Sequence, residues 1–413
     1  MSTIAALTLE QAEERVAAIA GREHTHIEDH VLSVAPADAS QIAAILRFAS
    51  ANGLALTPAG SGSKLAWGNP VAAAVRMDLK RMHTLREHAW QDMTCTVEAG
   101  CTWSAMQAAL ARHRQMVALD PLWPERATVG GIVAANDSGA LRLKYGGLRD
   151  LIIGMTIVLA DGTLARTGGK VVKNVAGYDL HKLLTGSFGT LGVIAEVNFR
   201  LHPVEEHART WTMIGEDVAQ FAESLRELLD TQMIPASVQL RTESQKCAID
   251  IRVAAVPECL DEHDVRLKKI FGAIAPNESG GAVWQARQQL FEKQDAVVLK
   301  VSLLPNEICA VLSELRHWTA AEGMEVSAVA QASGLMTVAV RPAAHALITV
   351  VDRLRAKLRT SGGSVVALQI PGTLRNHLDV WGCESNALPL MREIKRRFDP
   401  NCILNPGRFV GGI

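Results

Sequence analysis

Apolar and polar positions alternate along the first 205 residues in a way that predicts a succession of short helices and strands. Thr8 and Gln11 have the spacing of a capping box, which predicts a helix running to about residue 20. Apolar residues recur with a helical period over residues 38–53, where Asp38 is the N-cap candidate and Gly53 the stop.

The same region contains several strand candidates and one further helix candidate. Two apolar runs around Asp161-Gly162 predict a β-hairpin over residues 148–167. A long strand is predicted to end at Pro203, because proline cannot donate to a ladder. The remaining candidates are strands at 30–35, 74–79, 94–100 and 191–203 and at the start of 54–68, and a helix at 102–114.

The pattern changes after about residue 203, where the glycine-rich loops stop and helices and strands alternate. Helices are predicted at 217–231, 258–271, 281–291, 306–321 and 343–359, and strands at 237–240, 248–254, 296–302, 325–331, 335–340 and 364–369. This order predicts antiparallel strands with helices on one face. We therefore expect three segments: a first domain over 1–205, an α+β domain over 206–375, and a C-terminal segment over 376–413 that returns to the first domain.

Composition excludes several classes of protein. The 42 Lys and Arg residues nearly balance the 43 Asp and Glu residues, so no bulk charge draws the chain to nucleic acid. No apolar run reaches the roughly 20 residues that a membrane span needs, and no signal peptide is evident. The seven cysteines include no Cys-x-x-Cys spacing, so neither a metal nor an iron–sulfur site is expected. These features predict a cytoplasmic protein with reduced thiols.

Three loops rich in glycine, serine and threonine are the main candidates for chemistry. The first loop contains Pro58, Gly60, Ser61, Gly62, Ser63 and Lys64. Glycine allows backbone N–H groups to approach a ligand, and successive N–H groups form a nest that binds anions. The two serine hydroxyls would add donors and Lys64 a charge. The alternative for this loop alone is a polar surface turn.

The other two loops extend the pattern. The second covers residues 128–136, where Thr128 is a candidate cap for a helix that starts at Gly130, and where small residues alternatively serve close packing of that helix. The third covers residues 167–192, in which glycines surround Lys170 and Lys173. Three such loops between strands favour one long extended ligand, and a dinucleotide fits this description.

The sequence resembles a known family at this point. The stretches "PAGSGSK", "ATVGGIVAAN", "GGKVVKNVAGYDL", "GSFGTLGVIAEVNFRLHP" and "FDPNCILNPGRF" resemble, in this order, the FAD-binding fold of the vanillyl-alcohol oxidase / p-cresol methylhydroxylase (PCMH) superfamily. The third stretch is most similar to the FAD-binding subunits of bacterial glycolate oxidases. The resemblance implies an α+β protein: a PCMH-type FAD-binding domain of two α/β subdomains and a smaller antiparallel α+β cap domain.

The resemblance also implies which residues contact FAD. The first loop, with Gly60, Ser61, Gly62 and Ser63, would hold the pyrophosphate. Thr128, Gly130, Gly131, Ala134 and Asn136 would line the ribityl and isoalloxazine region, with Gly177, Tyr178 and Asp179 in the same wall, and Gly192 and Ile194 would contact the adenine side. Asp179 has an alternative role as the cap of a helix at 180–184. Covalent members carry histidine near Ser63, so the FAD is expected to be non-covalent.

Substrate residues are harder to assign. The cap-domain motif His-x-Gly-Asp-Gly-Asn-x-His of related D-2-hydroxy-acid dehydrogenases is absent, and His345 and His377 stand alone in the sequence. The candidates are Arg142 and Tyr145, in a loop that also carries Lys144 and Arg149 and faces the flavin in the family, and Arg375 and His377, for which a structural turn is the alternative.

The resemblance implies an FAD-dependent oxidoreductase acting on CH–OH groups of a small 2-hydroxy acid such as glycolate or D-lactate. It would be one subunit of a complex, beside a second FAD-containing catalytic subunit and an iron–sulfur subunit. Those partners would also bring it to the inner membrane as a peripheral protein. The alternative is a flavin-binding electron-relay or structural subunit with no substrate chemistry of its own.

Overall fold

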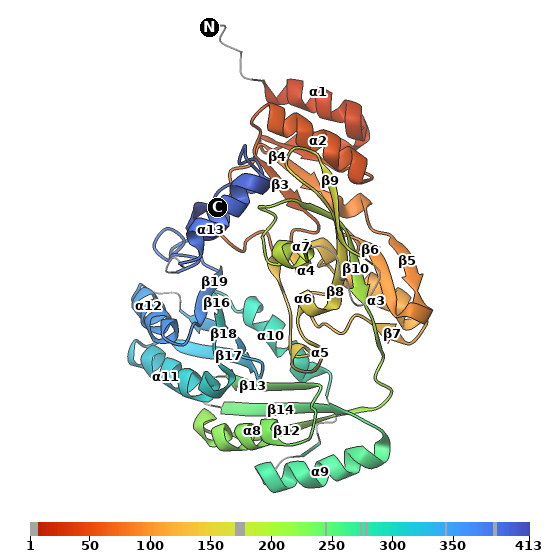
Figure 1. Cartoon of the computed structure of the whole chain (residues 1–413). Coiled ribbons are helices and arrows are strands. Elements are labelled where there is room, and N and C mark those ends of the chain that lie inside the picture. The colour runs from red at the N-terminus through yellow and green to blue at the C-terminus, as the bar shows by residue number, and fades with distance from the viewer. Residues whose placement is uncertain are drawn as a thin grey trace. The chain divides into compact units, whose positions relative to one another are not determined.

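The computed structural model describes residues 7–169, 178–243, 246–272, 275–276, 280–342, 345–382 and 386–413. The chain forms two compact units (Figure 1). Unit 1 comprises residues 1–137, 147–203 and 384–413, and unit 2 comprises residues 138–146 and 204–383. Residues 138–146 lie within the first predicted segment but belong to unit 2, because Leu143 packs against the core of unit 2.

Unit 1 begins with a small mixed sheet covered by helices. Its strand order is β1-β2-β4-β3, with β4 parallel to both β2 and β3. The strands are β1 Thr25–Glu28, β2 Val31–Val34, β3 Leu56–Ala59 and β4 Val75–Asp78, and the helices are α1 Leu9–Ala20 and α2 Ala39–Ala51. Both predicted N-caps are confirmed: Thr8 forms a capping box with Gln11, and Asp38 accepts from the Ser40 and Gln41 amides.

A second, antiparallel sheet completes unit 1. Its order is β5-β6-β10-β8-β9, and the predicted hairpin at Asp161-Gly162 joins β8 to β9. The strands are β5 Leu85–Ala89, β6 Thr94–Glu98, β8 Ile152–Val158, β9 Leu164–Gly168 and β10 Val193–Arg200, with a separate pair β7 Gln115–Met116 and β11 His202–Pro203. The remaining helices are α3 Trp103–Ala111, α4 Val129–Ala135, α6 Leu148–Leu151, α7 Leu180–Leu184 and α13 Leu388–Phe398, with 3₁₀ turns η1 Arg22–His24, η2 Leu79–Arg81, η3 Trp90–Asp92 and η8 Val410–Gly412.

Unit 2 is built on one antiparallel sheet of order β15-β12-β14-β13-β17-β18-β16-β19. The strands are β12 Ala208–Gly215, β13 Ser237–Glu243, β14 Lys246–Ala254, β15 Ala275–Pro276, β16 Val297–Ser302, β17 Glu325–Gln331, β18 Leu335–Arg341 and β19 Ser364–Gln369. Alternate residues of these strands, such as Leu240, Ile249 and Val338, form one apolar core. The expectation of antiparallel strands in this region is confirmed.

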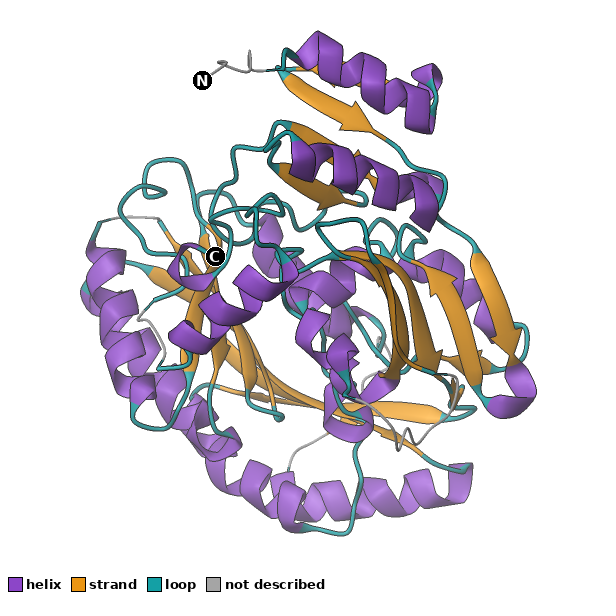
Figure 2. Ribbon diagram, turned by 45° about the horizontal axis from the view of Figure 1, so that its top comes forward, coloured by secondary structure: helices purple, strands orange, loops and turns teal. Residues whose placement is uncertain are grey.

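Four helices cover one face of this sheet (Figures 1 and 2). They are α8 Phe221–Asp230, α9 Pro257–Phe271, α11 Ile308–Ala321 and α12 Ala346–Arg359. The short α10 Ala286–Gln289 packs near the opposite face, where Leu290 joins a small cluster with Val298, Val329 and Ala339. Unit 2 also contains α5 Arg142–Tyr145 and the 3₁₀ turns η4 Val218–Gln220, η5 Ala282–Gln285, η6 Leu290–Glu292 and η7 Pro305–Glu307.

Some elements differ from the sequence-based expectation. The predicted helix at 281–291 is divided into η5, α10 and η6, and the side chain of Arg287 on α10 is buried. The elements that were not predicted include β1, β5, α5, β12 and α13. In β12 the apolar residues do not all lie on the buried face: Trp211 is fully buried, whereas Ile214 is 74% exposed. The sequence of β12 therefore lacks a clear alternation of apolar and polar residues. In α13 only Leu388 and Lys395 are buried, so the helix lacks a continuous apolar stripe.

Candidate functional site

A hollow in unit 1 gathers residues from all three glycine-rich loops. It occupies about 690 Å³, including solvent at its mouth. Its walls come from the loop after β3, the start of α4, the entry to β10 and the C-terminal segment. The lining residues are Pro58, Ala59, Gly60, Ser61, Gly62, Ser63, Lys64, Leu65, Leu79, Ala99, Thr128, Gly130, Gly131, Ala134, Ala135, Phe188, Gly189, Gly192, Ile194 and Arg408.

The first loop needs glycine at two places for different reasons. A Cβ on Gly60 would lie 2.1 Å from Thr128 Oγ1, so this glycine permits the loop to pack directly against the start of α4. Gly62 has φ +76°, a left-handed backbone that other residues adopt at a cost. Thr128 is the N-cap residue of α4, but its side chain makes no capping hydrogen bond and the helix starts at Val129.

Lys64 lines the hollow, but its charge is directed to the protein interior. Its Nζ lies 3.3 Å from Asp137 Oδ2 and donates to the Leu122 carbonyl oxygen at 3.3 Å. The Lys64 side chain is 5% exposed and that of Asp137 is 0% exposed. The ammonium also lies 5.2 Å from the Trp123 ring centroid and 5.6 Å from that of Trp67. The ammonium of Lys64 thus forms an ion pair with Asp137, and its contact with the ligand stays a prediction.

The C-terminal segment brings a second buried cation to the hollow. Arg408 is 6% exposed and donates to three carbonyl oxygens of the first loop and its continuation, those of Lys64, Leu65 and Trp67. Burial lowers the pKa of Arg408 to about 10, which still leaves the guanidinium charged at neutral pH. Sequence reasoning did not assign Arg408 a role, although it stands in the terminal stretch that carries the family resemblance.

The same segment is fixed to unit 1 by a buried ion pair. Lys395 Nζ lies 2.6 Å from Asp399 Oδ2 and donates to the carbonyl oxygens of Thr190 and Leu404. The Asp399 carboxylate accepts from the Ile403 and Leu404 amides in turn. These bonds hold the end of the chain against the loop that enters β10.

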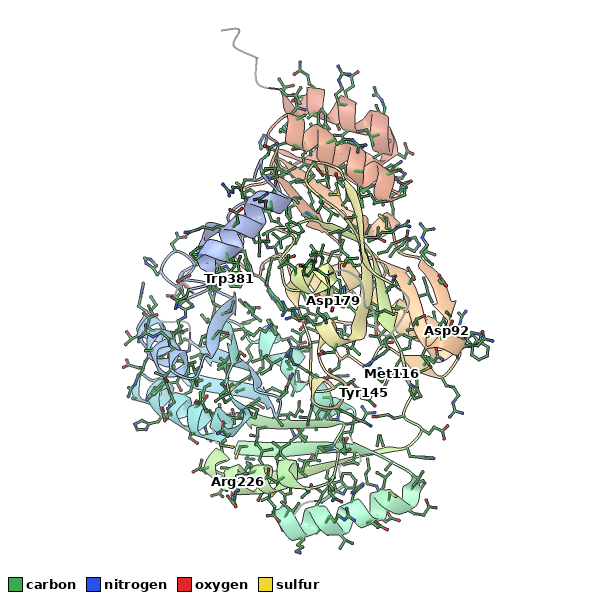
Figure 3. All side chains as sticks on the ribbon, in the orientation of Figure 1. Asp92, Met116, Tyr145, Asp179, Arg226 and Trp381 are labelled. Carbon is green, nitrogen blue, oxygen red and sulfur yellow. The ribbon has the colours of Figure 1, made fainter. Side chains whose placement is uncertain are left out.

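Three predicted cofactor residues in the described part of the chain, Asn136, Tyr178 and Asp179, do not line the hollow. Asn136 ends α4 with a left-handed backbone, φ +47°. Tyr178 is 88% exposed, and Asp179 holds Lys182 at 2.8 Å (Figure 3). Asp179 occupies the N-cap position of α7, as its alternative role predicts, although its side chain accepts no capping hydrogen bond. The prediction for Gly177 lies outside the described residues.

The residues of the hollow fit the dinucleotide that the loops predict. Most of its lining residues are glycine, alanine or serine, and such small side chains leave room for a flat ring. Ser61 Oγ is buried and has no hydrogen-bond partner among the described residues. A hydroxyl in that state is costly unless a ligand satisfies it, and a phosphate oxygen would accept its proton.

The predicted substrate residues of the loop after α4 belong to unit 2. Tyr145 donates its hydroxyl proton to Glu205 Oε1 at 2.7 Å, and Arg252 also binds Glu205 (Figure 3). Burial, then the contact with Glu205, raises the pKa of Tyr145 well above its usual range. Tyr145 is therefore a protonated structural donor. Arg142 is half-buried on α5, while Arg149 is exposed on α6 of unit 1.

The two histidines that stand alone in the sequence meet in the structure. The ring centroids of His345 and His377 are 4.9 Å apart in an edge-to-face contact, and both residues are exposed. Arg375 is exposed in the same turn. Among the described residues, no group of three His, Cys, Asp or Glu side chains could hold a metal ion.

A buried arginine that was not among the predicted site residues lies on α10 of unit 2. Arg287 is 8% exposed and donates through Nε to Thr337 Oγ1 at 3.2 Å and through Nη1 to the Ser138 carbonyl oxygen at 2.9 Å. Ser138 Oγ is buried without a hydrogen-bond partner among the described residues. Gln331 Oε1 is also buried without a hydrogen-bond partner among the described residues. Val329 of β17 pairs with Thr337 of β18, so Gln331, two residues further along β17, lies on the same face of the sheet as Thr337. The stretch "WQARQQL" around Arg287 could have signalled this cluster.

Comparisons with known proteins agree with this reading. The FAD binding domain family matches residues 32–168, and the family of FAD linked oxidases, C-terminal domain, matches residues 250–409. Glycolate oxidase subunit GlcD of Bacillus subtilis is 34% identical over 207 residues, which are 50% of this chain and 44% of that protein. D-lactate dehydrogenase of Archaeoglobus fulgidus is 25% identical over 417 residues and 92% of each chain.

Two further similarities bear on the subunit type and the fold. Glycolate oxidase subunit GlcE of Escherichia coli is 30% identical over 236 residues, 57% of this chain and 63% of that protein. The structure of p-cresol methylhydroxylase superimposes with a TM-score of 0.74 over 97% of this chain and 96% of that one, at 16% identity, which confirms the expected fold. Since GlcD and GlcE both match, the comparisons do not single out the GlcE subunit.

These matches define the class of the protein as an FAD-dependent oxidoreductase of the kind that acts on CH–OH groups. The expected cofactor, FAD, is confirmed at the level of the family. The two matched domains support the FAD-linked oxidase family. Within the described residues, no helix is both long and apolar enough to cross a membrane.

Proposed function

We propose that this chain is the FAD-binding subunit of a complex that oxidises a small 2-hydroxy acid, glycolate or D-lactate, to the 2-oxo acid. Its relatives are named for these two substrates: two are subunits of glycolate oxidase and a third is a D-lactate dehydrogenase. FAD would bind non-covalently in the hollow of unit 1, since position 63 is serine and not a histidine that could attach it.

The choice of substrate class rests on a buried cluster in unit 2 formed by Arg287, Thr337 and Ser138. A 2-hydroxy acid offers a carboxylate, which a buried guanidinium binds strongly through charge-assisted hydrogen bonds. Arg287 is 8% exposed and donates hydrogen bonds to the Thr337 hydroxyl and to the Ser138 carbonyl oxygen, beside the buried Ser138 hydroxyl.

The proposed chemistry divides between the cofactor and the protein. Bound FAD would accept the hydride that leaves C2 of the hydroxy acid. Arg287 would hold the substrate carboxylate, with Arg142 and the more exposed Arg375 and His377 as weaker candidates. A base must also take the hydroxyl proton. The eight strands of the unit 2 sheet contain no histidine, so this chain offers no obvious base on its sheet.

The missing base supports a dependence on partners. A second FAD-containing subunit would supply the histidines, and an iron–sulfur subunit would carry single electrons onward. No cysteine spacing in this sequence suits a cluster. The complex would lie in the cytoplasm or at the inner membrane through those partners. The same missing base favours a second candidate function, a flavin-binding electron-relay subunit that performs no substrate chemistry.

The first test is reduction of the flavin in the isolated chain. The chain, loaded with FAD, is mixed anaerobically with glycolate or D-lactate while the flavin absorbance is followed, and the rate is compared with that of the reconstituted complex. We expect slow or no bleaching by the chain alone and fast bleaching in the complex. Bleaching by the isolated chain at the rate of the complex would contradict the dependence on partners. A flavin that neither preparation reduces would leave the relay function as the better account.

The second test addresses the carboxylate. In the complex, Arg287→Met should raise the KM for the hydroxy acid by about tenfold or more, the loss typical of a charge-assisted hydrogen bond. Arg341→Met is the matched control, because Arg341 lies on the same sheet but is exposed and paired with Glu325. Equal effects of the two substitutions on KM would contradict the role of Arg287.

A further inference from the structure

The side chain of Gln331 in unit 2 buries an oxygen that awaits a hydrogen-bond donor. Gln331 ends β17 and is 4% exposed, and its Oε1 has no partner among the described residues. A buried acceptor in this state costs free energy until a donor reaches it. Glutamine is mostly an exposed residue in proteins, so this burial calls for a donor that a ligand brings.

The strand register places Gln331 beneath the segment that carries Arg287. In the sheet, β17 lies between β13 and β18. On β13, Gln239 is directly opposite Gln331 and donates to the Val283 carbonyl oxygen at 2.8 Å. On β18, Thr337 lies on the same face and accepts from Arg287 Nε at 3.2 Å. Val283 of η5 and Arg287 of α10 are four residues apart, so this segment crosses the sheet on both sides of Gln331.

A groove within unit 2 borders this cluster. It occupies about 1680 Å³, including solvent at its mouth. Its lining residues include Ala286, next to Arg287, and Val329, two residues before Gln331 on β17. A second buried hydroxyl, that of Ser138, also has no partner among the described residues, and the carbonyl oxygen of Ser138 accepts from Arg287. Polar atoms that lack partners thus lie beside Arg287 and close to open space.

The chemistry of the two side chains matches the two functional groups of a 2-hydroxy acid. A guanidinium only donates hydrogen bonds and suits a carboxylate, whereas a carboxamide oxygen only accepts them and suits a hydroxyl proton. In a 2-hydroxy acid the hydroxyl stands on the carbon next to the carboxylate, so Arg287 and Gln331 would recognise both groups together. A 2-oxo acid has an acceptor at that carbon, which would face Gln331 Oε1 without a hydrogen bond.

We propose that Gln331 accepts the hydrogen bond of the substrate C2 hydroxyl and so selects 2-hydroxy acids over other small carboxylates. The inference rests on the proposed function, because it takes Arg287 as the partner of the substrate carboxylate. An amide oxygen is too weak a base to remove the hydroxyl proton, so Gln331 orients the hydroxyl and another group takes the proton. The chain would then bind its substrate selectively although its sheet offers no obvious base.

The experiment compares glycolate with acetate, which differ only in the C2 hydroxyl. Their affinities for the full-length, FAD-loaded chain are measured anaerobically by titration calorimetry. We expect the wild type to bind glycolate about tenfold or more tightly than acetate. Gln331→Met should abolish this preference by weakening glycolate, with acetate unchanged. Gln289→Met is the matched control and should keep the preference, since Gln289 is an exposed amide of α10 in the same groove.

The outcomes separate this inference from the proposed function. If the wild type binds both acids equally, or if Gln331→Met keeps the preference, the inference is overturned, a water molecule is the better partner for Gln331 Oε1, and the carboxylate site stands. If the wild type binds neither acid, or if Arg287→Met binds both as the wild type does, the carboxylate site is refuted and the inference falls with it. Should Gln331→Met fail to fold, the wild type decides with D-lactate and pyruvate: pyruvate bound as tightly as D-lactate would refute the acceptor role.

Discussion

Replacement of Lys64 by methionine tests the geometry of the first loop most directly. Methionine has a similar length and preserves the apolar packing between Trp67 and Trp123, but it removes the ammonium. The Asp137 carboxylate, fully buried, would then lose the cation 3.3 Å away and keep the Leu122 amide, which donates to its Oδ2 at 2.8 Å.

The expected cost follows from the burial of both partners. Removing one member of a buried ion pair typically destabilises a protein by about 3–5 kcal/mol, because the remaining charge is left desolvated. An exposed pair such as Arg226 with Glu223 stabilises the fold far less, because water and salt screen its charges. Replacement of both partners, Lys64→Met with Asp137→Asn, removes the uncompensated charge, keeps an oxygen acceptor for the Leu122 amide and should recover most of the loss.

Urea unfolding of the apoprotein, followed by tryptophan fluorescence, gives the free energies for the two single variants and the double variant. Arg226→Met is the control on an exposed pair. A loss below about 1 kcal/mol for Lys64→Met, together with weaker FAD binding, would refute this reasoning. It would mean that Lys64 serves the ligand, as the sequence pattern suggested, and not the fold.

Three further predictions follow from single positions. Gly60→Ala places a Cβ 2.1 Å from Thr128 Oγ1 and should cost about 1–3 kcal/mol and most of the FAD content, whereas Gly281→Ala, with no neighbour within 4 Å, should retain full FAD. Acid precipitation should release all flavin, and flavin that stays on the polypeptide would contradict non-covalent binding. Cys95, whose pKa burial raises to about 12, should resist a thiol reagent at mild alkaline pH that labels exposed Cys402; equal labelling rates would contradict this burial.

The sequence predicts those parts of the site where the local backbone conformation restricts which residue can stand at a position. Glycine at positions 60 and 62 and small residues near 130 are local signals, since each excludes a side chain from one place. Twelve of the predicted cofactor residues line the hollow: Pro58, Gly60, Ser61, Gly62, Ser63, Lys64, Thr128, Gly130, Gly131, Ala134, Gly192 and Ile194. Helix caps such as Thr8 and Asp38 were predictable for the same reason.

What could not be predicted depends on partners far apart in the chain. The sequence shows Lys64 beside serines and glycines, a polar context that indicates a ligand contact. Only the fold brings Asp137 to it. In the same way, Arg287 and Thr337 are separated by 50 residues, and His345 meets His377 across 32 positions that show no pattern. Pairing of charges over such distances is decided by tertiary packing, which single-sequence periodicity does not encode.

The two ends of the chain therefore have to meet before the cofactor site is complete. Leu56 of β3 donates its N–H to the Ile403 carbonyl oxygen and accepts from the Asn405 amide, which makes the tail an added parallel partner beside the first loop. Asn405 also donates to the Phe188 carbonyl oxygen, so the tail joins the first and third loops. Contacts of such sequence separation form late, because loop closure costs entropy before they stabilise anything. The C-terminal segment thus borders the hollow and connects two of its loops, so FAD retention should depend on an intact C-terminal segment.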